Sequence, residues 1–176
     1  MILVALGANL PAPDGTRPLE TCRRAVKALD ALPGLRLRGL SRWYITTPIL
    51  VGAAQPEIAQ PAYINAVAHL LADPGVEIDP TDLLARLMSI ETAAGRVRGT
   101  RHAARVLDLD IISIGDTIRC APDPILPHPR AHERAFVLVP LADVAPGWVH
   151  PVLRLTVTAL IAGLPDQGVR PHSTVA

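Results

Sequence analysis

The chain has 176 residues and a mass of 18.7 kDa, which is enough for one domain with a sizeable core but hardly for two. Its residues are 49% hydrophobic and 19% charged, and this composition excludes a disordered, collagen-like or acidic solvating chain. Seventeen Lys and Arg against sixteen Asp and Glu leave a net charge of +1, which indicates neither a nucleic acid nor a membrane surface as partner. We therefore expect a single domain over residues 1–176 whose electrostatic function is local.

Other features of the composition narrow the class of protein further. No apolar run reaches the roughly 18 residues that a membrane span requires, and no signal-peptide pattern is present, so we expect a cytoplasmic protein. Lys27 is the only lysine, which excludes a phosphate-binding loop of the Gly-Lys type. Cys22 and Cys120 lack metal-binding spacing, and we expect two reduced, buried thiols, although one disulfide stays open.

The first half of the chain alternates between strand and helix patterns. The apolar run Met1–Leu6 predicts a buried strand, and apolar residues at helical spacing over residues 16–29 predict an amphipathic helix. Alternation and aromatic residues predict one strand over Leu35–Tyr44. The connection over residues 46–61 has no clean period, and a connection of that length is typically functional or mobile.

The second half continues with a strand, a helix and a strand. Alternation over Tyr63–Leu71 predicts a strand, and Asp79 is predicted to cap a helix that ends at Gly95. An Arg-rich loop then leads to a strand over Val106–Ile114 and a hairpin turn at Gly115-Asp116. Two more helices are predicted over residues 131–139 and 156–162.

The order of these elements predicts the fold class. Strand, helix, strand, strand, helix, strand is the order of a split βαβ arrangement. We therefore predict an α+β fold, namely a ferredoxin-like βαββαβ antiparallel sheet with helices packed on it. Its core would span residues 1–150, and residues 151–176 would form a C-terminal helical extension.

Asp108 and Asp110 carry the strongest local signal for chemistry. Alternation along the strand puts both carboxylates on one face with Cα atoms roughly 7 Å apart, so their charges repel unless a cation lies between them. Mg²⁺ is often held by one or two carboxylates together with substrate phosphates. For this motif alone a solvated strand face is the simpler explanation, but the flanking sequence favours a metal site.

Four arginines lie within ten residues upstream of this pair, with no acidic residue among them: Arg96, Arg98, Arg101 and Arg105. Guanidinium groups bind phosphate oxygens bidentately and keep their charge at any working pH. A loop kept soluble by arginines is the ordinary explanation for such a cluster. Next to a carboxylate pair, however, the cluster predicts a phosphoryl-transfer site.

A third candidate is the segment Pro127-His128-Pro129-Arg130. The prolines fix the local backbone, so His128 is a candidate phosphate ligand, although a lone His is more often structural. His132-Glu133 begins like a zinc-protease motif, but position 136 is Phe where the second His would stand. The sequence therefore favours a phosphate role over a zinc role here.

Together these motifs resemble those of the 6-hydroxymethyl-7,8-dihydropterin pyrophosphokinase family, whose members move the terminal pyrophosphate of ATP to a pterin alcohol in folate biosynthesis. The resemblance runs from residue 3 to about residue 150, and it is specific only as a set. The matching segments are Leu6-Gly7-Ala8-Asn9-Leu10, Trp43-Tyr44-x-Thr46, Tyr63-Ile64-Asn65-Ala66, Glu91-x3-Gly95-Arg96-Val97-Arg98, Arg105-x-Leu107-Asp108-Leu109-Asp110-Ile111, Pro127-His128-Pro129-Arg130 and Glu133-Arg134-Ala135-Phe136.

The resemblance implies a role for each matching residue. Asp108 and Asp110 would hold two Mg²⁺ ions that bridge the phosphates of ATP, and Arg96 and Arg105 would be the catalytic arginines. The implied ATP and phosphate contacts are Glu91, Arg98, Arg101, Ile111, His128 and Arg134. The implied pterin contacts are Tyr63 and Phe136 on the two ring faces, Asn65 at the ring edge, and Thr46, Thr47 and Pro48.

ATP and 6-hydroxymethyl-7,8-dihydropterin are thus the expected partners, for a chain that we expect to be a monomer. Association with another folate enzyme stays open. The chain departs from the family pattern at four places: His102-Ala103-Ala104 stands where Trp-Gly-Pro is common, Ala8 where Ser is usual, Pro11–Asp14 where the turn is shorter, and Asp123 where some members have Arg.

Two alternative functions stay open at this point. A nucleotidyltransferase also uses paired aspartates, but it releases pyrophosphate rather than AMP. A non-catalytic pterin- or nucleotide-binding module would keep the aromatic and amide residues but would not need the two carboxylates. The presence of both Asp108 and Asp110 counts against the second alternative.

Overall fold

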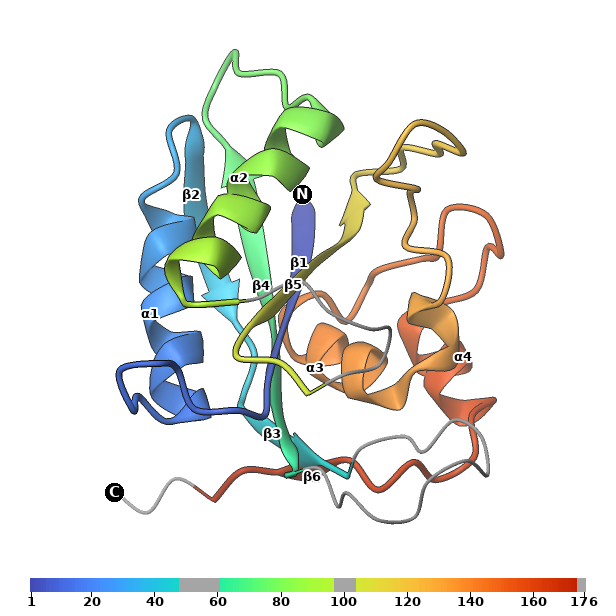
Figure 1. Ribbon diagram of the computed structural model, residues 1–176. Helices are drawn as coiled ribbons and strands as arrows, with labels where there is room; N and C mark the ends of the chain where they lie inside the picture. The colour runs from blue at the N-terminus through green and yellow to red at the C-terminus, as the bar shows by residue number, and fades with distance from the viewer. Residues whose placement is uncertain (48–60, 97–103, 174–176) are drawn as a thin grey trace.

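The computed structural model describes residues 1–47, 61–96 and 104–173, and Figure 1 shows their arrangement. One antiparallel sheet lies between two helical layers. Its strands are β1 (Ile2–Ala8), β2 (Leu35–Leu40), β3 (Tyr44–Thr46), β4 (Tyr63–Ala72), β5 (Asp108–Ile114) and β6 (Arg170–Pro171). Their spatial order is β5, β1, β4, β3, β6, and β2 also pairs with β4. These findings confirm the α+β class and the antiparallel sheet.

Helices α1 (Pro18–Asp30) and α2 (Pro80–Ala93) cover one face of this sheet. The side chain of Asp79 accepts a hydrogen bond from the backbone N–H of Asp82 at 2.8 Å, which confirms the predicted helix cap. Alternate residues of the central strands pack beneath the two helices, among them Leu6 and Ala68. Among the described residues, more of the buried large aliphatic side chains lie in this layer than in the layer on the opposite face.

The opposite face carries α3 (Ala135–Val144) and α4 (Val157–Ala162), and a 3₁₀ helix over Ala131–Glu133 precedes α3. The helix predicted over residues 131–139 is therefore two helices, because Arg134 between them has an extended backbone. The side chain of Thr156 caps α4, as the predicted start of that helix requires.

The prediction of one continuous strand over Leu35–Tyr44 is wrong, because the structure divides this segment into β2 and β3. A register shift lies between Leu37 and Gly39, and the chain leaves the sheet after Leu40. The hydroxyl of Ser41 then accepts a hydrogen bond from the backbone N–H of Val67 at 2.9 Å, in place of a backbone partner. This break lets β2 and β3 both pair with the long strand β4.

Three smaller expectations also need correction. Gly115-Asp116 forms a turn, but no strand follows it directly to complete a hairpin within the described part of the chain. Cys22 is a buried free thiol whose pKa burial raises to about 12, whereas Cys120 is free but exposed. The C-terminal segment is not only helical, because β6 returns to pair with β3.

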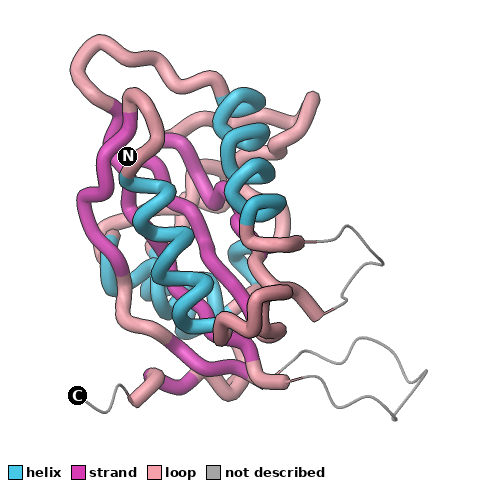
Figure 2. The backbone as a smooth tube through the Cα atoms, turned by 60° about the vertical axis from the view of Figure 1, so that its left-hand side comes forward, coloured by secondary structure: helices cyan, strands magenta, loops and turns pink. Residues whose placement is uncertain are grey.

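The strand register shows which residues lie together at one end of the sheet. Gly7 of β1 lies opposite both Asn65 of β4 and Asp108 of β5, and Thr46 of β3 lies opposite Tyr63. The end of β1, the end of β3, the start of β4 and the start of β5 therefore meet at one edge, which Figure 2 shows from a second direction. Among the described helices, none is long and apolar enough to cross a membrane.

Candidate active site

A row of three residues crosses the sheet at this edge. Asn65, Gly7 and Asp108 are direct neighbours on adjacent antiparallel strands, so their side-chain positions share one face. It is the face that carries α3, because Leu109 and Ala66, which alternate with them, pack in the core under α1 and α2. The register therefore brings the predicted pterin-reading amide and the predicted carboxylates to one surface.

Gly7 keeps the middle of this row open. A Cβ atom at this position would lie 3.3 Å from Oδ1 of Asn65 and 4.0 Å from Cδ1 of Tyr63. A Cβ atom would therefore crowd the amide of Asn65 and would be in ordinary contact with the ring of Tyr63. The absence of a side chain at Gly7 thus leaves a space between the amide of Asn65 and the carboxylate of Asp108.

Asp108 is the charged centre of the site. Its Oδ1 atom lies 2.8 Å from Nη1 of Arg96, and its Oδ2 atom lies 2.5 Å from Nη1 of Arg105. The two arginines come from opposite ends of the Arg-rich segment, and both meet one carboxylate. The structure therefore brings together three of the four residues that the sequence assigns to catalysis.

Asp110 lies one alternation further along the same face of β5. Desolvation raises the pKa of its carboxyl group, and the negative charge of Asp108 raises it further. The Nε2 atom of His128 lies 3.8 Å from Oδ2 of Asp110. A carboxylate whose charge is disfavoured in this way is a strong candidate to bind an added cation.

Glu91 fixes Arg96 from the side of α2. Its carboxylate is buried, and its Oε1 atom accepts hydrogen bonds from the backbone N–H of Leu109 at 2.7 Å and from the guanidinium of Arg96. Burial raises the pKa of Glu91, while these two hydrogen-bond partners oppose the shift. Glu91 therefore joins α2, β5 and Arg96, which is a positioning arrangement.

The residues assigned to the pterin lie on β3, β4 and the first turn of α3. Asn65 is buried, and its Nδ2 atom donates a hydrogen bond to Oγ1 of Thr46 at 2.9 Å. Tyr63 is partly buried, and the charges of Arg105 and Asp108 both influence its pKa, which burial raises. Phe136 is the second residue of α3, and it is partly buried against the apolar cluster that contains Val67.

Cationic groups border this region on the side of α3. The guanidinium of Arg134 lies 5.6 Å from the centre of the Phe136 ring. Burial lowers the pKa of Arg134, and the positive charge of Arg130 adds to this effect. Burial also lowers the pKa of His128, against the opposing influence of Asp110. A partly buried guanidinium whose charge is disfavoured in this way is ready to bind phosphate oxygens, and the imidazole of His128 is a polar group beside it.

The structure does not place every predicted site residue beside Asp108. Ile111 alternates with Asp110, and its side chain is buried in the core under α1 and α2, so its predicted nucleotide contact has no side-chain support. Thr47 is described and exposed. Pro48, Arg98 and Arg101 lie outside the described residues, as do His102 and Ala103.

Gly7 and Asn9 lie in the family-matching segment Leu6–Leu10, but neither of them was assigned a role in the site from the sequence. Asn9 is only 1% exposed, and it contacts the backbone of Arg105 through both its side chain and its main chain. The signal available was a glycine and a polar amide directly after an apolar strand, where the backbone turns. That signal indicates a turn, but it does not identify the partner.

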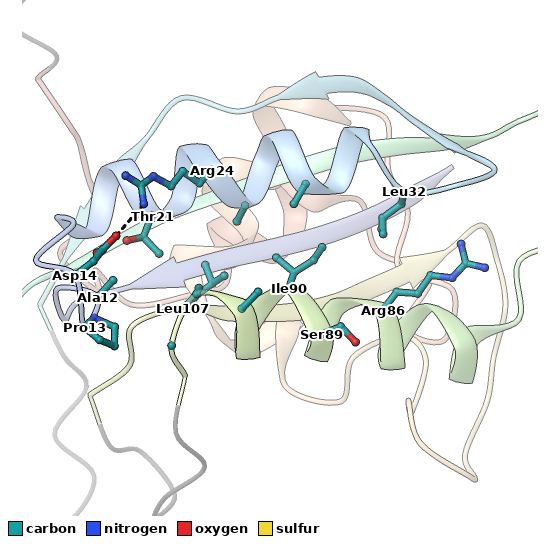
Figure 3. Close-up of a pocket in the computed structure, with 15 residues that line it drawn as sticks. Ala12, Pro13, Asp14, Thr21, Arg24, Leu32, Arg86, Ser89, Ile90 and Leu107 are labelled. Carbon is teal, nitrogen blue, oxygen red and sulfur yellow. Dashed lines mark hydrogen bonds and ion pairs between the residues drawn. The ribbon is translucent and has the colours of Figure 1, made fainter.

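A cavity of about 660 Å³ lies elsewhere, between α1 and α2, and Figure 3 shows the side chains that line it. Its walls are mainly apolar, with Arg24 paired to Asp14 near one end and Arg86 near the other. None of the residues that the sequence assigns to substrates lines it. The residues that line this cavity are therefore different from those gathered around Asp108.

The site combines paired carboxylates, converging arginines and an amide beside aromatic residues. This combination is typical of an enzyme that transfers phosphoryl groups to a flat heterocycle. The comparisons with known proteins agree. The model of the family described as 7,8-dihydro-6-hydroxymethylpterin-pyrophosphokinase (HPPK) matches residues 3–146. The chain belongs to this family.

Individual relatives support the same assignment. The 2-amino-4-hydroxy-6-hydroxymethyldihydropteridine pyrophosphokinase of Pseudomonas aeruginosa is 39% identical over 168 residues, which cover 96% of this chain and 94% of the relative. The protein of the same name from Haemophilus influenzae is 36% identical, with 93% of this chain and 92% of the relative covered.

A solved structure supports the fold. The crystal structure of a triple mutant of Plasmodium falciparum HPPK-DHPS superposes with a TM-score of 0.67 at 13% identity, over 92% of this chain. This chain spans 42% of that longer chain.

Proposed function

We propose that the residues around Asp108 line a cleft in which this chain performs its pyrophosphokinase reaction. As a member of the family, the chain transfers the pyrophosphoryl group of ATP to 6-hydroxymethyl-7,8-dihydropterin in folate biosynthesis. The observation that carries the placement is the convergence of Arg96 and Arg105 on Asp108, in register with Asn65 across Gly7. The cleft thus has a phosphate side and a heterocycle side.

On the heterocycle side, Tyr63 and Phe136 would cover the two faces of the pterin. The buried amide of Asn65 would read its hydrogen-bonding edge, held in orientation by Thr46. A flat ring with polar edges needs two apolar surfaces and a fixed polar group, and Phe136 is the only Phe in the chain. Thr47 and Pro48 follow Thr46 directly, and we assign them to the same side.

On the phosphate side, Arg96 and Arg105 would exchange the carboxylate of Asp108 for oxygens of the triphosphate. Their charge stabilises the transferred group most in the transition state, when negative charge is spread over its oxygens. His128 and Arg134 would bind further phosphate oxygens from the side of α3. Arg98 and Arg101 belong to the same proposal through the sequence alone.

The two carboxylates fit a pair of Mg²⁺ ions. Asp110 carries a charge that its surroundings disfavour, and within the described residues no group of three or more His, Cys, Asp or Glu side chains forms a complete metal site. Mg²⁺ typically takes its remaining ligands from water and substrate phosphates, so two aspartates are sufficient. When bound, Mg²⁺ neutralises charge on the phosphates and orients them.

The reaction itself is an in-line displacement. The hydroxymethyl oxygen of the pterin forms a bond to the β-phosphorus of ATP, while the bond from that phosphorus to the oxygen shared with the α-phosphorus breaks. AMP leaves with that oxygen, and the hydroxymethyl proton passes to solvent. Positioning by Tyr63, Asn65 and Phe136 and charge stabilisation by Arg96 and Arg105 supply the catalysis.

The deciding experiment measures AMP release from ATP with the pterin alcohol, with and without divalent metal. We expect AMP and pterin pyrophosphate in the complete mixture, and neither product without metal. Free pyrophosphate with an adenylylated pterin would instead support a nucleotidyltransferase. Loss of AMP release in Asp110→Asn, but not in Asp116→Asn at an exposed turn on the same segment, would locate the reaction in the proposed cleft.

The proposal also covers the fold, the extent of the catalytic unit, the oligomeric state, the location and a possible partner of the chain. The order β5, β1, β4, β2 with antiparallel neighbours supports the ferredoxin-like arrangement, with residues 1–176 acting as one catalytic unit. A monomeric state and a cytoplasmic location stay predictions. Association with another folate enzyme is supported by relatives in which the matching part is joined to more sequence, since this chain spans 42% of the Plasmodium HPPK-DHPS chain.

A further inference from the structure

Asn9 is a buried amide at the junction of the two halves of the cleft. Its Oδ1 atom accepts a hydrogen bond from the backbone N–H of Arg105 at 2.7 Å, and its Nδ2 atom donates one to the carbonyl of Pro61 at 3.2 Å. Its own backbone N–H donates to the carbonyl of Arg105 at 2.9 Å. One side chain thus contacts two segments that lie 52 and 96 residues away in the sequence.

Both contacts lie next to residues that we propose to bind the substrates. Arg105 reaches Asp108 on the phosphate side, and Pro61 lies two residues before Tyr63 on the heterocycle side. The amide of Asn9 therefore connects the backbone that carries a catalytic cation with the backbone that carries a ring-stacking residue. An amide carries its acceptor and its donor on two separate atoms, so it can bond to both segments at once.

The residues after Asn9 support the same arrangement at the other arginine. Leu10 donates its backbone N–H to the carbonyl of Arg105 at 3.1 Å. Pro13 packs against Gly95, where a Cβ atom would lie 2.4 Å from Cδ of Pro13 and where φ is +90°. Gly95 directly precedes Arg96, so the segment from Asn9 to Pro13 contacts the backbone beside both catalytic arginines.

We propose that Asn9 is a positioning residue for pyrophosphoryl transfer, one that sets the place of Arg105 relative to the bound pterin. The inference rests on the proposed site. Asn9 touches neither substrate in this scheme, and it acts through the backbone of Arg105 and Pro61. Its removal should slow the chemical step more than it weakens binding, because the misplaced group acts mainly in the transition state.

The first test compares Asn9→Ala with Cys22→Ala, which removes a fully buried group from α1 on the opposite face. We expect Asn9→Ala to lower kcat for AMP release per folded molecule by about 10- to 100-fold, the range that misplacement by about 1 Å produces. The Kd of the pterin, from titration calorimetry, should change by less than about threefold. Cys22→Ala should lower Tm and leave kcat per folded molecule unchanged.

The second test uses Asn9→Asp, which keeps the acceptor for Arg105 but loses the donor to Pro61. Protonation of a buried carboxyl restores that donor, and burial raises its pKa. We therefore expect kcat of this variant, relative to the wild type at the same pH, to rise as the pH falls.

Each outcome decides something different. The positioning role is overturned if Asn9→Ala has an unchanged kcat per folded molecule. If Asn9→Ala does not fold, the role is overturned by an Asn9→Asp variant whose kcat does not recover as the pH falls. A different result would contradict the proposed site itself. In that case the wild type would release AMP, and the Asp110→Asn variant would release it as well.

Discussion

The two faces of the sheet carry opposite kinds of side chain on the same strands. On β5, Leu109 and Ile111 point into the core under α1 and α2, whereas Asp108 and Asp110 point to the face of α3. The first face holds apolar side chains packed together, and the second holds, beside its own apolar cluster under α3, charges that are satisfied by ion pairs. A single alternating strand therefore serves stability on one side and chemistry on the other.

This contrast separates the expected effects of mutations. Substitutions of the polar site residues on the face of α3 should change catalysis with little loss of fold, and substitutions of core residues under α1 and α2 should do the reverse. The cavity between α1 and α2 belongs to the second class, because its lining contains none of the proposed substrate residues. The following variants test that division, from the largest expected effect on activity to the smallest effect of any kind.

The largest effect is expected for Asp110→Ala. It removes a proposed metal ligand, and we expect turnover to fall by at least about 1,000-fold, the upper part of the range for loss of one preorganised electrostatic group. Metal-dependent binding of ATP, measured by calorimetry, should be lost while the circular dichroism spectrum is kept. Asp116→Ala is the matched control, and near-normal activity in Asp110→Ala would contradict the metal assignment.

Arg105→Ala comes next. The side chain lies 2.5 Å from Asp108, and its charge is expected to act mainly in the transition state. We expect kcat to fall by about 100-fold or more, with a smaller change in the Kd of ATP. Arg24→Ala on the exposed surface of α1 removes the same charge from the other face and should leave kcat unchanged. An equal loss in both Kd and kcat/KM would show that Arg105 serves binding alone.

Leu87→Ala probes the opposite face. Leu87 is fully buried in α2, and its truncation leaves a cavity in the larger core. We expect the free energy of unfolding to fall by about 2–5 kcal/mol, as for other Leu to Ala changes in cores. The kcat per folded molecule, measured well below Tm, should stay within about twofold of the wild type. A large loss of kcat here would show that the two faces are coupled.

The sequence predicted the division between faces better than it predicted the contacts within the cleft. Alternation is local, so the shared face of Asp108 and Asp110 and the cap at Asp79 follow from neighbouring residues. The contact of Asn9 with Arg105 depends on how β1 and β5 pair, which no local pattern encodes. The break at Ser41 is similar, because its hydroxyl replaces a ladder partner that only the folded sheet defines.

Ile111 shows the reverse situation. A family resemblance assigned it to the nucleotide, yet the alternation that places Asp110 in the cleft places the next side chain in the core. Glu91 lies between these cases: its helix was predicted, but its hydrogen bond to the backbone of Leu109 across to β5 was not. Long-range polar contacts are thus the part of the site that required the structure.

The smallest expected effect concerns acid stability, where the two faces should respond with opposite signs. The raised pKa of Asp110 means that the folded state binds this proton more tightly than the unfolded chain does, so ionised Asp110 costs stability at neutral pH. That cost disappears as the pH falls through the raised pKa toward the ordinary value of 3.8. In chelator, Asp110→Asn should therefore have a Tm a few degrees above the wild type at neutral pH, and an equal Tm in acid.

Asp14, beside α1, supplies the comparison of opposite sign. Hydrogen bonds from Thr16 and Arg24 lower its pKa from 3.8 to about 2, so ionised Asp14 stabilises the fold above pH 3.8, and this contribution is lost as the pH falls toward about 2. Asp14→Ala should lower Tm slightly at neutral pH, because the group is exposed and solvent screens its ion pair. Thermal melts of both variants from neutral pH into acid check the signs. If Asp110→Asn had a lower Tm than the wild type at neutral pH, the carboxylate of Asp110 would stabilise the fold. Stability and chemistry would then not be separated between the two faces at β5.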